Sequence, residues 1–123
     1  MDVNVQIMDT VREEDGLAMS SRNAYLTSVE RERAPIVYQS LRAARELYDS
    51  RFARGEEEVS AKDLVEVVKS VLESEPMISE VEYVAIDDLE NMRPMEKVGS
   101  EGCVVSLACR LGSVRLIDNV VLR

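Results

Sequence analysis

The sequence predicts an α+β fold, in which a small antiparallel sheet of about three strands packs against two main helices. Two long segments space their apolar residues three and four apart, as one face of a helix does. Three later segments are strand-like and lie between turn signals. Because helices and strands are segregated along the chain, the pattern favours an antiparallel sheet over a parallel one.

The first element is expected to be a short strand over residues 3–11, because valine and isoleucine recur there at nearly alternating positions. Asp15-Gly16 is the strongest turn signal after it. A loop is expected from this turn to Leu26. The predicted sheet and helices are therefore preceded by a strand and a loop.

A helix is expected to start after Thr27, because Thr27 and Glu30 form the T-x-x-E pattern of a capping box. Pro35 lies inside the helical pattern, where a proline clashes with the preceding turn, so a kink or break is expected near Ala34. Gly55 is expected just past the helix end. The apolar stripe of this segment comprises Ala34, Val37, Leu41, Ala44, Tyr48 and Phe52.

A solvated acidic linker, residues 56–58, precedes a second helix. Ser60 and Asp63 give a second capping signal, and Pro76 ends the helical pattern. The buried face of this helix is expected to comprise Leu64, Val67, Val68, Val71 and Leu72.

The remaining chain is expected to form three strands. The first contains Val81, Tyr83 and Ala85, and a loop follows over residues 87–102. Residues 103–111 and 114–122 are joined by Gly112-Ser113, a Gly-X pair typical of a type II′ hairpin turn.

Composition is that of one globular domain, residues 1–123, with 46% hydrophobic residues. The net charge is 15 − 24 = −9, which argues against nucleic acid and anionic membranes as partners. No apolar segment approaches the roughly 18 residues of a membrane span, and the N-terminus lacks the pattern of a signal peptide. A cytoplasmic location is therefore expected.

Cys103 and Cys109 are expected to be reduced, buried thiols. They lie six residues apart on one strand, about 20 Å along a regular strand, which is too far for a disulfide. The chain has no histidine and no close cysteine pair, so no metal site is expected.

Residues 15–23 (DGLAMSSRN) contain the main candidate for chemistry. Ser20 and Ser21 provide two hydroxyls, and Arg22 provides a guanidinium that can bind two phosphate oxygens as a fork. Gly16 suits a loop that closes over a ligand. The residues alone leave open a structural alternative, in which this polar segment satisfies backbone groups at the approach to a helix.

The wider segment, residues 10–26 (TVREEDGLAMSSRNAYL), resembles the signature of the pantothenate synthetase (pantoate–β-alanine ligase) family nearly residue for residue. The RLIDN run at residues 115–119 and the VEYV run at residues 81–84 resemble two further segments of that family. The resemblance thus covers the whole chain. Glu14, where the family often has proline, and Pro35 depart from its pattern.

The resemblance implies that Ser20, Ser21 and Arg22 contact the phosphates of ATP. It also implies that Met19 lies beside the nucleotide and that Val11 meets the adenine through its backbone. The implied reaction joins pantoate to β-alanine through a pantoyl adenylate, with Mg²⁺ held by the ATP phosphates and by water. No residue of this chain is assigned a catalytic role or a metal.

By the same resemblance, the chain is expected to be the C-terminal lid domain of a two-domain ligase, with the N-terminal nucleotide-binding domain absent. That domain would be its partner and would hold the pantoate and β-alanine pockets. The chain alone is expected to be inactive. The alternative is a stand-alone, non-enzymatic interaction or self-association module, for example a homodimer that swaps the strand at residues 3–11.

The residues around the loop and at the end of the chain are given structural roles. Arg12 and Glu13, next to the turn, could orient the loop by an ion pair but are expected to be solvated. Asp15 is expected to organise the turn through its own side chain. Tyr25 is expected to pack against the loop. Arg115 and Asp118 are expected on opposite faces of one strand, unpaired with each other.

Overall fold

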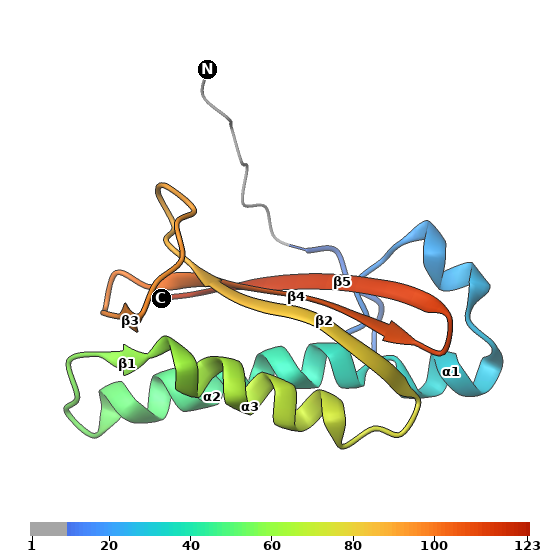
Figure 1. Cartoon of the computed structure of the whole chain (residues 1–123), viewed down its shortest axis with the longest axis horizontal. Helices are drawn as coiled ribbons and strands as arrows, with labels where there is room; N and C mark the ends of the chain where they lie inside the picture. The colour runs from blue at the N-terminus through green and yellow to red at the C-terminus, as the bar shows by residue number, and fades with distance from the viewer. Residues whose placement is uncertain (1–9) are drawn as a thin grey trace.

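The computed structural model describes residues 10–123 and has two layers (Figure 1). One layer is an antiparallel three-stranded sheet in the order β2-β4-β5. Helices α2 and α3 lie side by side along one face of it, with α2 against β5 and α3 against β2. The predicted α+β class is confirmed. The elements in chain order are η1 (Ser21–Tyr25), α1 (Ser28–Arg33), α2 (Ile36–Ala53), β1 (Val59–Ser60), α3 (Ala61–Glu73), β2 (Ile78–Asp87), β3 (Lys97–Val98), β4 (Cys103–Leu111) and β5 (Val114–Leu122).

Strands β4 and β5 form a hairpin with the predicted ends. Leu111 pairs with Val114 across the turn, and Gly112 has φ +61°, as the first central position of a type II′ turn requires. Every second side chain of β4 faces the helices, so this strand forms the centre of the core. The buried residues on that side are Cys103, Val105, Leu107, Cys109 and Leu111.

The two cysteines are free and buried, as predicted. Burial raises the pKa of Cys103 to about 12 and that of Cys109 to about 11. Both thiols therefore stay protonated at neutral pH and act as small apolar side chains.

The helical segment that follows Thr27 is broken at Pro35, as predicted. The predicted capping box is present, since Thr27 Oγ1 accepts from Glu30 N at 3.1 Å and Glu30 Oε1 accepts from Thr27 N at 2.9 Å. Helix α1 ends at Arg33, and Pro35 then occupies the N-cap of α2. Gly55 follows the end of α2 with φ +88°, the conformation expected there.

The second capping prediction is wrong in its detail. Ser60 does occupy the N-cap of α3, but its side chain accepts no capping bond. Instead, Ser60 belongs to β1, which pairs with β3, and Ala61 N donates to Glu96 O at 2.9 Å. This bond satisfies the first amide of α3, whereas a serine cap would satisfy the amide one or two residues further on. Strands of two residues are too short to produce an alternating pattern.

The face of α3 that packs on the sheet is also narrower than predicted. Leu64, Val68 and Leu72 are buried, whereas Val67 and Val71 are only half-buried at its edges.

Residues 3–9 of the predicted first strand lie outside the described residues. Its described end, residues 10 and 11, does not belong to a strand, and the next residue, Arg12, forms an isolated antiparallel bridge with Ala18. Among residues 10–123, no helix combines the length and the apolar character that a membrane crossing requires.

Candidate functional site

Residues 11–22 form a loop, called the signature loop below, that starts from a narrow turn beside β5. Arg12 bridges Ala18, and beyond this bridge Met19 N donates to Val11 O at 2.9 Å. Asp15 Oδ1 accepts from Leu17 N at 3.3 Å, so the predicted organising role of Asp15 is confirmed. These contacts define the root of the loop, residues 11–18.

Gly16 occupies a position in the root that glycine alone suits. Its φ is +96°, and a Cβ added there would overlap the ring of Tyr38 from α2. The turn therefore sits directly against the helix layer, and its shape depends on the missing side chain.

The tip of the loop, residues 19–22, leads into η1 and is exposed. Ser20 is the N-cap of η1, and its Oγ accepts from Arg22 N at 3.1 Å. Asn23 N donates to Ser20 O at 3.1 Å. The structural alternative from the sequence is thus realised in part, since Ser20 satisfies backbone N–H groups while its hydroxyl hydrogen stays available to a ligand oxygen.

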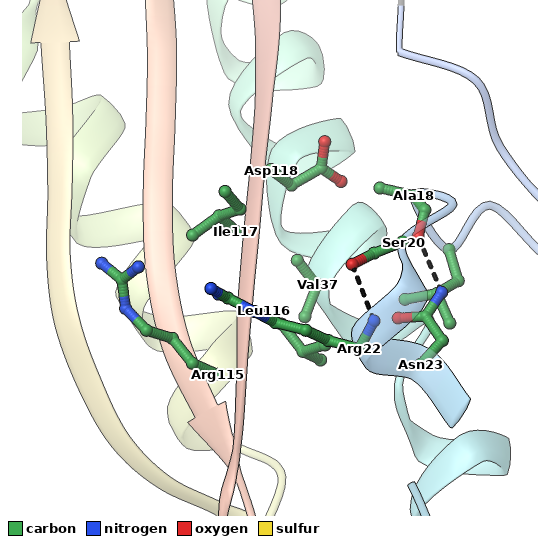
Figure 2. Close-up of a pocket in the computed structure, with 10 residues that line it drawn as sticks. Ala18, Ser20, Arg22, Asn23, Val37, Arg115, Leu116, Ile117 and Asp118 are labelled. Carbon is green, nitrogen blue, oxygen red and sulfur yellow. Dashed lines mark hydrogen bonds between the residues drawn. The ribbon is translucent and has the colours of Figure 1, made fainter. Parts of the chain in front are cut away.

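A pocket of about 170 Å³ lies between this loop and β5 (Figure 2). Ser20 and Arg22 line it from the loop side, and Arg22 extends from η1 toward β5 beside Leu116. Ser21, Met19 and Val11 do not line it, and Met19 and Val11 are 52% and 67% exposed. The structure thus brings two of the five predicted residues together at one pocket, and the nucleotide contacts of all five stay predictions.

The pocket is smaller than the roughly 300–1,000 Å³ of complete small-molecule sites. It is also open on one side, where the tip is exposed. Its dimensions suit one phosphate group of a larger ligand better than a whole nucleotide.

Arg12 contradicts the prediction that it is solvated. Its Nη1 donates to Asp118 Oδ2 at 2.6 Å and its Nη2 to Asp118 Oδ1 at 3.0 Å, while the Asp118 side chain is only 1% exposed. Nη1 also donates to Gly16 O at 3.0 Å, and the guanidinium lies 4.2 Å from the centroid of the Tyr38 ring. Sequence reasoning missed this pair because its members are 106 residues apart and belong to two separate motifs.

Arg115 and Asp118 lie on opposite faces of β5, as predicted (Figure 2). Arg115 Nε donates to Glu82 Oε1 at 2.6 Å, and Arg110 Nε donates to Glu82 Oε2 at 2.9 Å. The hydrogen bond from Arg115 is the main reason that the pKa of Glu82 is lowered. Arg115 also lines the pocket, but its guanidinium is bonded to Glu82 on the other face of β5, so the guanidinium that faces the pocket is that of Arg22 (Figure 2).

The charge of Arg22 is available to a ligand. Within the part of the chain that the structure describes, no carboxylate forms an ion pair with its guanidinium. Arg31, by contrast, is engaged by Asp15 at 2.6 Å, and its hydrogen bond lowers the pKa of Asp15. An unpaired guanidinium beside a hydroxyl is a suitable arrangement for binding an anion.

Two other residues of the segment differ from expectation. The prediction that Tyr25 packs against the loop is wrong, since its side chain is 78% exposed. Asn23, which received no role from the sequence, donates from Nδ2 to Ala18 O at 3.0 Å and so closes the tip onto the root. Its Oδ1 is buried and has no hydrogen-bond partner among the described residues.

No group of three or more His, Cys, Asp or Glu side chains that could hold a metal ion is found among residues 10–123. The potential ligand-binding groups at the pocket are hydroxyl and guanidinium groups, which bind oxyanions.

Comparison with known proteins identifies relatives of one kind. The sequence profile described as Pantoate-beta-alanine ligase matches residues 1–121. A pantothenate synthetase of Chloroflexus aggregans is 45% identical over 120 residues, which are 98% of this chain and 41% of that protein. A bifunctional pantoate ligase/cytidylate kinase of Synechocystis is 38% identical over 98% of this chain and 22% of its own length.

Solved structures agree with the sequence comparison. Pantothenate synthetase from Thermus thermophilus has a TM-score of 0.73 and 36% identity, over 90% of this chain and 37% of that one. Pantoate-beta-alanine ligase from Francisella tularensis, complexed with beta-gamma ATP and beta-alanine, has a TM-score of 0.50 and 28% identity, over 91% of this chain and 31% of that one. The chain spans about 40% of the length of the pantothenate synthetases it matches. By its profile match and its relatives, this chain belongs to the pantoate–β-alanine ligase family.

Proposed function

We propose that this chain supplies the ATP-phosphate-binding loop of a pantoate–β-alanine ligase, as a single C-terminal domain that closes over the nucleotide. The observation that supports this most directly is the placement of Ser20 at one pocket with Arg22, which has no ion-pair partner within residues 10–123, on a loop whose root is fixed. The small, open pocket agrees with a site that is completed by another part of the enzyme.

In the proposed reaction, a carboxylate oxygen of pantoate attacks the α-phosphorus of ATP. Pantoyl adenylate forms and pyrophosphate leaves, and then the amine of β-alanine attacks the acyl carbon and AMP leaves. Negative charge grows on the phosphate oxygens during the first step. Hydroxyls of Ser20 and Ser21 and the fork of Arg22 would stabilise this charge, because donors aimed at a developing charge lower the barrier.

The other proposed contacts are with the nucleoside. Val11 would meet the adenine through its backbone, and Met19 would lie against the nucleotide, which agrees with the exposure of both side chains. Mg²⁺ would arrive on the ATP phosphates as part of the substrate. The pantoate and β-alanine pockets belong to the N-terminal domain of the proposed enzyme, which functions in the cytoplasm.

The chain alone is expected to bind ATP weakly and to form no pantothenate. Ordering the exposed tip on a ligand costs conformational entropy, and the few contacts of a half-site offset little of that cost.

A chimeric enzyme tests the proposal. This chain would replace the matching segment of the Chloroflexus aggregans pantothenate synthetase, and AMP formation would be measured with pantoate and β-alanine present. Arg22→Ala is expected to lower kcat by about a hundredfold, as the loss of one transition-state donor does. Arg54→Ala, which removes an exposed arginine at the far end of α2, is the matched control and should leave kcat unchanged. An active chimera that tolerates Arg22→Ala would contradict the assignment of the loop.

Self-association is a second candidate, favoured by the sheet face opposite the helices. Tyr83, Ala108 and Ile117 form a row across the three strands on that face, and Tyr83 and Ile117 are 44% and 54% exposed. Apolar side chains grouped on an exposed sheet face can pair with a second copy. Light scattering at increasing protein concentration would detect such a dimer, and Ile117→Lys should abolish it. A monomer at all concentrations would exclude this candidate.

A further inference from the structure

The root and the tip of the signature loop are held in different ways. The tip is exposed; beyond Met19, whose amide donates to Val11 O of the root, the hydrogen bonds of Ser20 join neighbouring residues to one another. Leu17 of the root is buried in the hydrophobic core, and the side-chain hydrogen bonds from the described root to the sheet come from the guanidinium of Arg12. This guanidinium makes four hydrogen bonds, to both carboxylate oxygens of Asp118, to Gly16 O and, at 3.3 Å, to Asn119 O.

The position of Arg12 makes it a link between three parts of the fold. Its backbone bridges Ala18, so both arms of the root are attached to it. Its side chain lies between Asp118 of β5 and the ring of Tyr38 of α2. Ser20 follows Ala18 by only two residues, so the direction in which the tip leaves the sheet depends on this link.

The same contact offsets the negative charge of Asp118, which would otherwise repel a phosphate group. Asp118 lines the pocket that Ser20 and Arg22 border (Figure 2). A bare carboxylate there would repel a phosphate group and would weaken the effect of Arg22. Both oxygens of Asp118 are instead engaged by Arg12, and Oδ1 also accepts from Asn119 N at 2.7 Å.

We propose that Arg12 is a positioning residue for the phosphate loop: it fixes the root to β5 through Asp118 and neutralises that carboxylate beside the pocket. The proposal rests on the proposed phosphate-binding function of residues 20–22. Arg12 itself does not line the pocket and is assigned no contact with the nucleotide.

The test uses the ¹⁵N-labelled chain and two readouts. Tripolyphosphate is titrated while the amide signals of Ser20, Ser21 and Arg22 are followed, since shifts in fast exchange report even weak binding. Hydrogen exchange of the Met19 amide, which donates to Val11 O, reports whether the root stays closed.

The main variant is Arg12→Met combined with Asp118→Asn, because it removes the link without leaving a buried charge that would threaten folding. We expect a folded protein whose tripolyphosphate affinity falls about tenfold and whose Met19 amide exchanges more than about tenfold faster. Arg12→Met alone should bind tripolyphosphate more weakly still, because it leaves Asp118 uncompensated.

Arg45→Met is the matched control. Arg45 lies on α2, donates to Val121 O of β5 at 3.2 Å and lies 5.9 Å from the ring centroid of Tyr48, so it resembles Arg12 but is remote from the loop. It should change neither readout.

The outcomes separate the two proposals. Wild-type affinity together with unchanged Met19 exchange in the double variant would overturn the role of Arg12 and leave the phosphate loop intact. If the unaltered chain shows no shifts at residues 20–22 while Met19 exchange still depends on Arg12, the phosphate-binding function fails and the link is only structural. Binding by Arg12→Met that equals or exceeds that of the double variant would refute the charge-neutralising part.

Discussion

The β4–β5 hairpin and the signature loop both reverse the chain, yet different contacts hold them. The hairpin follows from residues that are close in sequence, namely two apolar strands and a glycine with positive φ between them. The root of the loop depends on Asp118 and Tyr38, which are far from it in the sequence. A reversal fixed by remote contacts can therefore be loosened by changes that leave the hairpin unaffected, as a segment that closes on a ligand requires.

The largest expected loss of stability comes from a substitution in the β4–β5 hairpin. Leu107→Ala removes a fully buried side chain at the centre of β4, and its cavity should lower the free energy of unfolding by about 3 kcal/mol. Urea denaturation followed by circular dichroism would measure this. Ile117→Ala, on the exposed face of the adjoining strand, should cost less than about 1 kcal/mol.

If the two reversals are independent, Leu107→Ala should leave the tripolyphosphate shifts of residues 20–22 unchanged in the folded protein. A loss of those shifts in folded Leu107→Ala would show that the tip depends on core packing and not only on its root.

A smaller effect is expected at the root. Gly16→Ala forces a side chain into a positive-φ position and against Tyr38, which should cost about 2 kcal/mol. Gly55→Ala is the matched control, since Gly55 has φ +88° and no atom within 4 Å of an added Cβ. It should cost only the backbone term, about 1 kcal/mol. Equal losses in the two variants would mean that Tyr38 moves aside and that the root tolerates a side chain.

This contrast also explains which features were predictable. Two apolar segments joined by Gly112-Ser113 predict both strands of the hairpin, and Pro35 and the Thr27 capping box predict the helix break and its start. Each of these signals consists of residues that are close together in the chain, so it can be recognised from the sequence alone.

The contacts that were missed act between segments. The pair Arg12–Asp118, the pairing of β1 with β3 and the hydrogen bond from Ala61 N to Glu96 O all join residues distant in the chain. For the site, the motif predicts that Ser20 and Arg22 belong together, but the pocket also needs β5, whose RLIDN run gives no indication of its partner. Only the folded chain places Asp118 beside the loop.

The smallest expected effect concerns the exposed ion pairs of the sheet, which contrast with the buried pair at the root. The hydrogen bond from Arg115 lowers the pKa of Glu82 below its ordinary value of 4.5. A carboxyl whose folded-state pKa is lowered stabilises the protein above its unfolded pKa, and this contribution is lost as the pH falls through the folded-state pKa. The free energy of unfolding of the wild type should therefore exceed that of Glu82→Gln at pH 7, and the difference should shrink below pH 4.5.

Urea denaturation at pH 7 and at pH 3 would measure both free energies of unfolding. Arg115→Gln should remove the same pH dependence, because it deletes the main cause of the lowered pKa of Glu82. A difference that grows in acid would have the wrong sign for this assignment, and the Glu82 carboxylate would then destabilise the fold.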